Sequence, residues 1–247
     1  MLQQTFLHLP GVGEYRERRF WRAGIRDWTA FLDACAGGHL SSRRHERLAP
    51  AVEESFQHYA AGDWRHFDAV LPSAHKWRAL GDLADRALYV DIETTGLAEA
   101  DSITVIGTYD GREARAFIAG RDLDEAVEII EAHPLIVTFN GACFDMPLIR
   151  QRFHYNLFNH VHLDLRFPLK RLGFAGGLKK IEHAFGIERS ERTRGLDGWD
   201  AVRLWDEYRR GHANSLDVLM EYNLEDVKNL QPLARFVYDH LRAGLQA

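Results

Sequence analysis

The segment from Ala87 to Ile92 is a short, almost entirely apolar run with the composition of a β-strand. A strand with one face in water alternates polar and apolar residues, whereas a run like this one indicates a strand covered on both faces. A sheet built around such a strand needs helices packed on each side of it. This single segment therefore favours an α/β fold.

The rest of the chain after residue 81 fits that expectation. Strand patterns recur four more times, and two of them flank the tight turn Asp110-Gly111, which predicts one antiparallel hairpin. Segments with apolar residues at helical spacing lie between the strands and after them, so we predict a mixed sheet flanked by helices. Pro232 should kink or interrupt the final helix. The expected strands are 87–92, 103–109, 114–118, 135–139 and 161–165, and the expected helices are 123–130, about 147–153, 178–185, 200–208 and from 215 onward.

Before residue 81 the patterns are only helical. We expect helices at 14–23, around Trp28, Phe31 and Leu32, at 43–61, and from Pro72 onward, with residues 80–83 as a connection. This change of pattern predicts a small all-helical domain over residues 1–81 and an α/β domain over residues 82–247.

One turn in the first of these domains resembles part of a helix-hairpin-helix, a motif that grips phosphate through backbone N–H groups. It is Phe6-Leu7-His8-Leu9-Pro10-Gly11-Val12-Gly13, and Arg16, Arg18, Arg19 and Arg22 follow it. The alternative is a simple helix cap in a packing domain, with Glu17 standing where the motif usually has a small residue.

Charge and cysteine content exclude several classes. Residues 1–80 hold 11 basic and 9 acidic residues, a net +2, and residues 81–247 hold 20 and 27, a net −7. A global basic footprint for nucleic acid is therefore missing. The two cysteines, Cys35 and Cys143, exclude a disulfide framework and a cysteine-rich zinc site. No apolar run approaches the ~20 residues that span a bilayer, and no secretory signal is present, so we expect a soluble cytoplasmic protein.

Acidic residues stand at the ends of the apolar segments. Asp91 and Glu93 end the first strand and point to the same side of the sheet, because strand side chains alternate. Asp145 follows the strand at 135–139, and Asp226 lies in the final helix one turn after Tyr222. If these acids converge, they need hard cations such as Mg²⁺ or Mn²⁺ to offset their repulsion. Taken singly, the first two sites also fit a helix cap and a turn with an N-capping aspartate.

Three motifs together resemble the DEDD superfamily of ribonuclease-H-like 3′–5′ exonucleases. They are Asp91-Ile92-Glu93-Thr94-Thr95-Gly96, Asn140-Gly141-x-x-Phe144-Asp145 and Tyr222-x-x-x-Asp226. With Tyr222 in the third motif, the chain resembles the DEDDy branch of the superfamily. The branch with a histidine in this motif would carry that histidine five residues before the aspartate, where this chain has Glu221. Within the superfamily, the strand at 103–107 and the helix start at 177–182 resemble an uncharacterised prokaryotic ribonuclease-H-like group.

The resemblance implies a ribonuclease-H-like fold and a set of site residues. Asp91, Glu93, Asp145 and Asp226 would hold two Mg²⁺ or Mn²⁺ ions, and Tyr222 would orient the attacking water. Thr94, Asn140 and Phe144 would lie near the terminal nucleotide. Two further features stay open: Asp164 is either a supporting acid or a helix cap, and His160 and His162 are either buried histidines or a transition-metal site.

A local basic rim is also expected near the site, from Lys170, Arg171, Lys179, Lys180, Arg189, Arg192 and Arg194. The sequence thus predicts a metal-dependent 3′–5′ exonuclease acting on single-stranded DNA or RNA. The alternatives are a structure-specific endonuclease on the same core and a nucleic-acid-binding protein on an inactivated nuclease fold. Loss of a metal ligand would mark the last of these, and all four acids are present.

Overall fold

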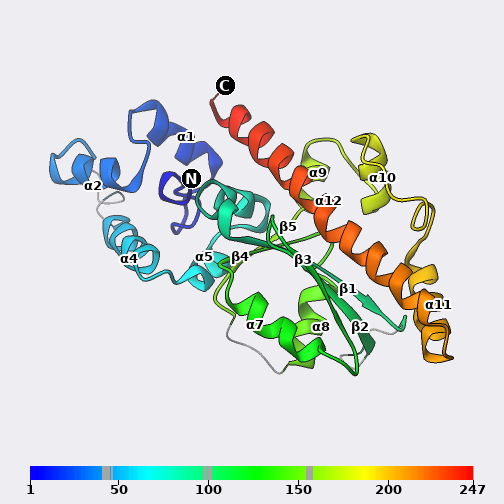
Figure 1. Ribbon diagram of the computed structural model, residues 1–247. Coiled ribbons are helices and arrows are strands. Elements are labelled where there is room, and N and C mark those ends of the chain that lie inside the picture. Colours follow the sequence, from blue (N-terminus) through cyan, green and yellow to red (C-terminus); the bar gives the residue numbers. More distant parts are fainter. Residues whose placement is uncertain (41–44, 46, 97–98, 100–101, 154–157, 247) are drawn as a thin grey trace.

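The computed structural model describes residues 1–40, 45, 47–96, 99, 102–153 and 158–246 (Figure 1). Its centre is a five-stranded sheet in the order β3-β2-β1-β4-β5. The first three strands pair antiparallel, whereas β4 runs parallel to β1 and β5 runs parallel to β4. The predicted mixed sheet is confirmed. The strands are β1 (Ala87–Thr94), β2 (Ile103–Tyr109), β3 (Ala114–Ile118), β4 (Leu135–Thr138) and β5 (Val161–Asp164).

Helices cover both faces of this sheet, as the apolar first strand requires. Leu88, Val90 and Ile92 pack in one buried cluster with the helices α7 (Ala126–Glu131) and α8 (Asp145–Arg152). The short helix η5 (Leu123–Glu125) leads into α7. The long helix α12 (Ala213–Gln246) crosses the opposite face (Figure 1). Because side chains alternate along a strand, Asp91 and Glu93 face the side of α12.

Three helices connect β5 to α12. They are α9 (Arg166–Arg171), α10 (Leu178–Ala184) and α11 (Gly198–Arg209). The expected interruption of the last helix is wrong, because α12 runs through the exposed Pro232 as one continuous helix. Proline removes one backbone hydrogen bond. Leu230 and Leu233 on either side of it are buried, so packing against the sheet layer keeps the helix together.

The chain before β1 is helical, as expected, and three of its details differ from the prediction. The segment after Pro72 is a 3₁₀-helix, and residues 80–83 form a helix of their own. A further short helix, α5, was not predicted because it buries only Trp64 and Phe67. Part of the expected helix at 43–61 lies outside the described residues. The elements are η1 (Leu2–Gln4), α1 (Glu14–Arg22), α2 (Trp28–Ala36), α4 (Ala49–Ala60), α5 (Trp64–Val70), η2 (Ser73–Ala79), α6 (Leu80–Leu83) and η3 (Ala84–Arg86).

The candidate helix-hairpin-helix is incomplete. Helix α1 begins after the Gly11–Gly13 turn, but within residues 1–13 only the 3₁₀-helix η1 precedes that turn. Glu17 explains the departure from the motif. Its carboxylate is buried, forms a two-point ion pair with Arg78 at 2.7 and 2.9 Å, and accepts the Phe6 backbone N–H. This turn therefore belongs to a packed structure.

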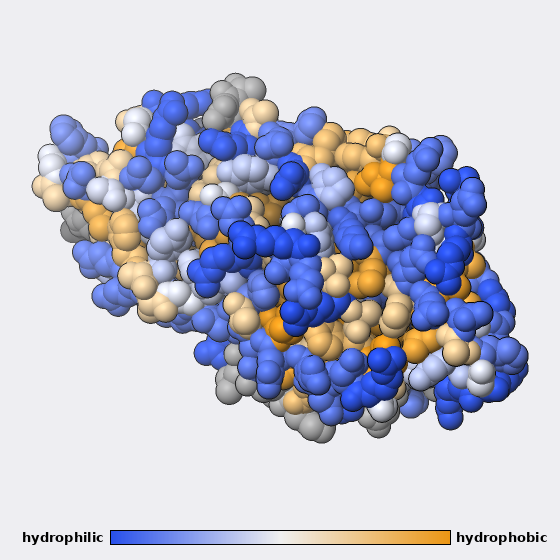
Figure 2. Space-filling view, in the orientation of Figure 1, coloured by the Kyte–Doolittle hydropathy of each residue, from blue (hydrophilic) through white to orange (hydrophobic). Residues whose placement is uncertain are grey.

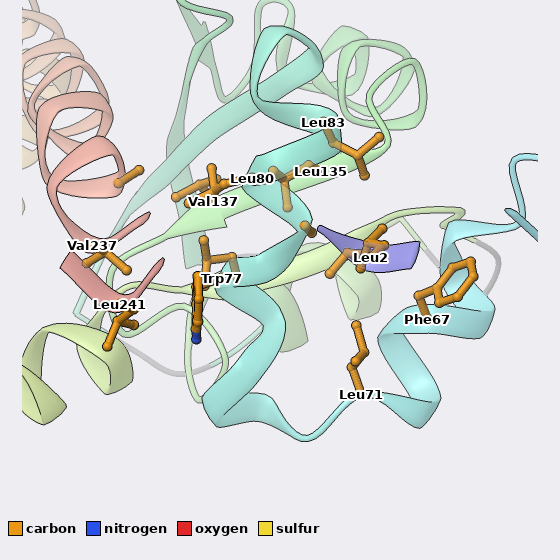
Figure 3. Packing of buried hydrophobic residues seen from close by; sticks show 14 of the residues in the cluster. Leu2, Phe67, Leu71, Trp77, Leu80, Leu83, Leu135, Val137, Val237 and Leu241 are labelled. Atoms are coloured by element: carbon orange, nitrogen blue, oxygen red, sulfur yellow. The ribbon is translucent and has the colours of Figure 1, made fainter. Parts of the chain in front are cut away.

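One buried cluster joins the helical segment to the sheet. Leu2, Trp77 and Leu80 lie against Leu135 and Val137 of β4, and residues of α12 close the cluster from the other side (Figure 3). Most of the surface seen in Figure 2 is hydrophilic, with smaller hydrophobic patches over the middle of the molecule. Among the described helices, none is long and apolar enough to cross a membrane.

Candidate active site

The crossing of β1 and α12 brings three carboxylates together. Asp91, Glu93 and Asp226 each offer an oxygen, and these oxygens lie within 4.8 Å of one another. Asp91 and Glu93 reach this point from alternate positions of β1, and Asp226 comes from the helix above them. Residues more than 130 positions apart in the sequence thus share one small, buried volume.

Asp145 lies beside this triplet but outside it. It is the first residue of α8, and its Oδ1 accepts the backbone N–H of Ile92 at 3.2 Å, between the two acids of β1. Its charge is felt by Asp91 and Glu93. All four predicted acids therefore meet in one region, three of them in mutual contact range and the fourth against the backbone of β1.

Burial disfavours the ionised form of these carboxylates. It raises the pKa of Glu93 to about 8 and that of Asp145 to about 7, and nearby acids act in the same direction. Burial also raises the pKa of Asp91 well above its usual range and raises that of Asp226. Such a group of buried oxygens needs protons or cations, and oxygen ligands at this spacing suit Mg²⁺ or Mn²⁺.

Two basic side chains already reach into the site. Arg189 forms an ion pair with Asp226, and Glu182 holds the same guanidinium at 2.6 and 2.8 Å. The Nζ of Lys179 donates to the hydroxyl of Tyr222 and lies 4.1 Å from the centre of its ring. The sequence predicted both residues as part of a local basic rim near the site. The side chain of Arg189 is instead almost fully buried, because it neutralises two buried acids.

The other residues of the expected rim are partly neutralised. Arg192 pairs with Glu221 at 2.8 Å, and Arg171 lies 3.5 Å from Glu14. The expected rim is therefore smaller than the sequence suggested.

Tyr222 stands one turn before Asp226 and is buried. Burial and the neighbouring carboxylates raise the pKa of its hydroxyl, so the group keeps its proton at neutral pH. Because the ammonium of Lys179 can only donate, the tyrosine oxygen accepts from it and its own O–H remains able to donate. The hydroxyl is therefore oriented as a hydrogen-bond donor.

Asn223 is a site residue that the sequence analysis missed. Its side-chain N–H donates to the Oδ2 of Asp91 at 3.0 Å, from a fully buried position next to Tyr222. Gly107 of β2 lies opposite Asp91 in the register, and a Cβ there would overlap the amide of Asn223. The available signal was a glycine inside an otherwise apolar strand, which often marks a close approach.

The second motif forms a loop around Asp164. The carboxylate of Asp164 accepts the backbone N–H groups of Asn140 at 2.8 Å and Ala142 at 3.1 Å. It also accepts that of Arg166 at 3.0 Å, at the start of α9, so it both caps this helix and fixes the loop. Asn140 is the one non-glycine residue with a positive φ among those described, and its side chain accepts from Arg166.

The remaining predicted residues flank the acids. Phe144 precedes Asp145 and is 37% exposed, and Thr94 follows Glu93 and is buried, with its Oγ1 accepting the N–H of Gly96. His160 and His162 lie apart from the acids at the sheet edge. Burial lowers the pKa of His162 to about 3, and its Nε2 lies 2.9 Å from the Thr138 hydroxyl. No described group of three or more metal-ligating residues includes either histidine.

Comparison with known proteins agrees with this fold. A family model described as the RNase H superfamily matches residues 88–238, which contain all of the sheet except the first residue of β1 and include all four acids. Among solved structures, the chain is similar to the family B DNA polymerase from the hyperthermophilic archaeon Pyrobaculum calidifontis, with 20% identity and a TM-score of 0.49. The similarity covers 61% of this chain and 24% of the polymerase. No curated protein matches the chain significantly.

Proposed function

The chain belongs to the RNase H superfamily, and on this basis we propose that it is a metal-dependent 3′–5′ exonuclease acting on single-stranded nucleic acid. The observation that carries this proposal is the meeting of Asp91, Glu93 and Asp226 within 4.8 Å, with Asp145 alongside. A buried set of oxygen donors without a serine, cysteine or histidine among them favours hydrolysis assisted by metal ions over nucleophilic catalysis.

The four acids fit two divalent cations. Their buried oxygens carry raised pKa values, and a hard cation relieves the repulsion that raises them. Asp91, Glu93, Asp145 and Asp226 would therefore hold Mg²⁺ or Mn²⁺. When bound, such ions lower the pKa of a water molecule and offset the charge of the leaving oxygen.

Tyr222 would orient the attacking water or a phosphate oxygen. Its hydroxyl keeps its proton, because the pKa is raised, and so it cannot act as a general base. With its oxygen held by Lys179, it donates towards the space beside Asp226, where it positions the attacking water or a phosphate oxygen.

Arg189 and Lys179 balance the charge of the site. Arg189 keeps Asp226 neutralised and in place, while Glu182 fixes the guanidinium from the other side. The negatively charged phosphates of a nucleic acid are repelled by the acids of the site. The positive charges of Arg189 and Lys179 reduce this repulsion. We assign both residues to binding the substrate backbone and positioning the ligands.

The direction of attack is tested with blocked strands. End-labelled DNA and RNA oligonucleotides are incubated with Mg²⁺ or Mn²⁺ and resolved on a gel, using strands with a bulky group at the 3′ or the 5′ end. We expect a ladder from the 3′ end that the 3′ block stops and the 5′ block does not. Cleavage of a circular single strand would instead favour the endonuclease, and binding without cleavage would favour an inactivated nuclease fold.

A further inference from the structure

The most exposed large apolar side chain among the described residues is Trp199, of which 77% is exposed. It stands in the first turn of α11, where a capping box fixes the backbone. Asp197 accepts the N–H of Trp199 at 2.8 Å and that of Asp200 at 3.1 Å, and Asp200 accepts the N–H of Asp197. The helix buries Leu204 and Trp205 on its other side. Trp199 is thus held in solvent by an ordered element.

Its place is next to the candidate active site. A Cβ on Gly96 would lie 3.9 Å from the Cζ3 of Trp199, so the edge of the indole borders this residue. Gly96 follows Glu93 by three residues, which a chain spans in at most about 11 Å. Asp200, the next residue, feels the charge of Lys179, whose ammonium reaches Tyr222. Trp199 therefore stands beside the end of β1, at the edge of the site.

Two other exposed aromatic residues also lie near the candidate active site. The exposed large apolar residues of the described chain are Tyr15, Val70, Phe144, Phe167 and Trp199. Phe144 precedes Asp145, and Phe167 follows Arg166, which contacts Asn140. Three of the five thus flank the segments that form the site. Exposed rings next to cationic groups are the arrangement that binds unpaired bases, because every base presents a face for stacking.

We propose that Trp199 is a base-stacking subsite, which holds an unpaired nucleobase of the strand whose phosphodiester lies at the acids. This inference rests on the proposed nuclease function and extends it, since it assigns a residue outside the three acidic motifs to the choice of single strands. A base inside a duplex is already stacked on both faces, so it cannot stack on the indole of Trp199 unless it is first unpaired.

The test compares Trp199→Ala and Trp199→Phe with Tyr15→Ala. Tyr15 is a matched control, because it is 75% exposed and lies on α1 in the helical segment. Binding is measured by anisotropy with fluorescent single strands in Ca²⁺, using intact strands and strands with one abasic position moved stepwise from the 3′ end. Cleavage of the same strands is measured in Mn²⁺. Melting temperatures should match the wild type, because the changed side chains are exposed.

We expect Trp199→Ala to weaken binding of the intact strand by about 5- to 150-fold, the range for losing one base–aromatic stack. One abasic position should weaken wild-type binding by a similar factor and leave Trp199→Ala unaffected. Trp199→Phe should retain most of the affinity, and Tyr15→Ala all of it. Equal affinities of wild type and Trp199→Ala for intact and abasic strands would overturn the subsite, whatever the cleavage assay gives. Tryptophan-dependent binding without cleavage would support the subsite and refute the nuclease function.

Discussion

At the scale of single residues, the site depends on groups that hold the carboxylates as much as on the carboxylates themselves. Asn223 donates to Asp91, and Arg189 binds Asp226. Tyr222 directly precedes Asn223 on α12, and Lys179 donates to its hydroxyl oxygen. The proposed roles of these residues can be separated, because Asn223 and Arg189 contact the proposed metal ligands, whereas Tyr222 would act on the reacting groups.

Replacing Tyr222 by phenylalanine tests whether its hydroxyl positions the reacting groups. The ring and its packing remain and only the hydroxyl is lost, so folding and metal affinity should be preserved. We expect kcat to fall by about 10- to 1,000-fold, as for the loss of a positioning group. Tyr208→Phe, which removes a hydroxyl from α11, serves as the control. A Tyr222→Phe variant with wild-type kcat would make this tyrosine an ordinary packing residue.

Gly107 and Asn223 test the support of Asp91. Gly107→Ala places a methyl group where the Asn223 amide lies, and Asn223→Ala removes the same hydrogen bond without crowding the strand. Both should weaken Mn²⁺ binding, by about 10- to 100-fold as for other groups that orient metal ligands. Gly244→Ala, at a position with open space around it, should leave binding unchanged. Tight Mn²⁺ binding by both site variants would show that Asp91 needs no such support.

The sequence predicted part of this arrangement. Period-2 alternation placed Asp91 and Glu93 on one side of the sheet, and helical spacing placed Tyr222 with Asp226. Asn223 was not predicted, and Arg189 was predicted only as part of a basic rim near the site. Their contacts with the acids depend on where α12 crosses β1 and on how the loop after α10 folds back. Such long-range contacts leave no local pattern. Arg189 in particular has the local signature of a solvated charge.

At the scale of elements, β1 and α12 build the site and the other elements hold them. The strand boundaries followed from apolar runs and from the Asp110-Gly111 turn, where the Asp110 carboxylate accepts two backbone N–H groups at 2.8 Å. The final helix was expected from residue 215, but its continuity through Pro232 was not, because a proline signals a break that packing here overrides. Helix α5 and the 3₁₀-helix η2 are short, and their stability comes from packing that the sequence pattern does not express.

Pro232→Ala tests whether packing holds α12 together against its own sequence. The residue is exposed, so the exchange loses little contact area and restores a backbone donor inside the helix. We expect the free energy of unfolding to rise by up to about 3 kcal/mol, the difference in helix propensity between the two residues. Urea unfolding monitored by circular dichroism measures it. A loss of stability would mean that the proline is needed for the path of the helix.

At the scale of the whole molecule, the helical segment and the sheet share a hydrophobic cluster. Residues from η1, η2 and α6 pack on β4, and α12 contributes Val237 and Leu241 to the same cluster (Figure 3). The division at residue 81 that the sequence predicts therefore marks a change of secondary structure within a continuous core. The same helix α12 carries Asp226, so the site and this core are linked through one element.

Asp91, Glu93, Asp145 and Asp226 would together form a divalent-metal site. Protons and metal compete for them: Glu93 and Asp145, with pKa values of about 8 and 7, are largely protonated at pH 6.5 and largely ionised near pH 9. Because these pKa values are raised above the ordinary 4.5 of Glu and 3.8 of Asp, the metal-free fold loses stability progressively as the pH rises from about 4 to about 8, where both groups have ionised. Metal binding should therefore strengthen with pH and release protons at pH 6.5.

The most direct measurement is calorimetric titration of the protein with Mn²⁺ at pH 6.5 and pH 8.5, in buffers of different ionisation enthalpy. We predict binding at both values, tighter at pH 8.5, with net proton release at pH 6.5 that is smaller at pH 8.5. Asp91→Ala should lose most of the binding. Absence of Mn²⁺ binding by the wild type, or equal binding by Asp91→Ala, would contradict the metal site and with it the proposed nuclease.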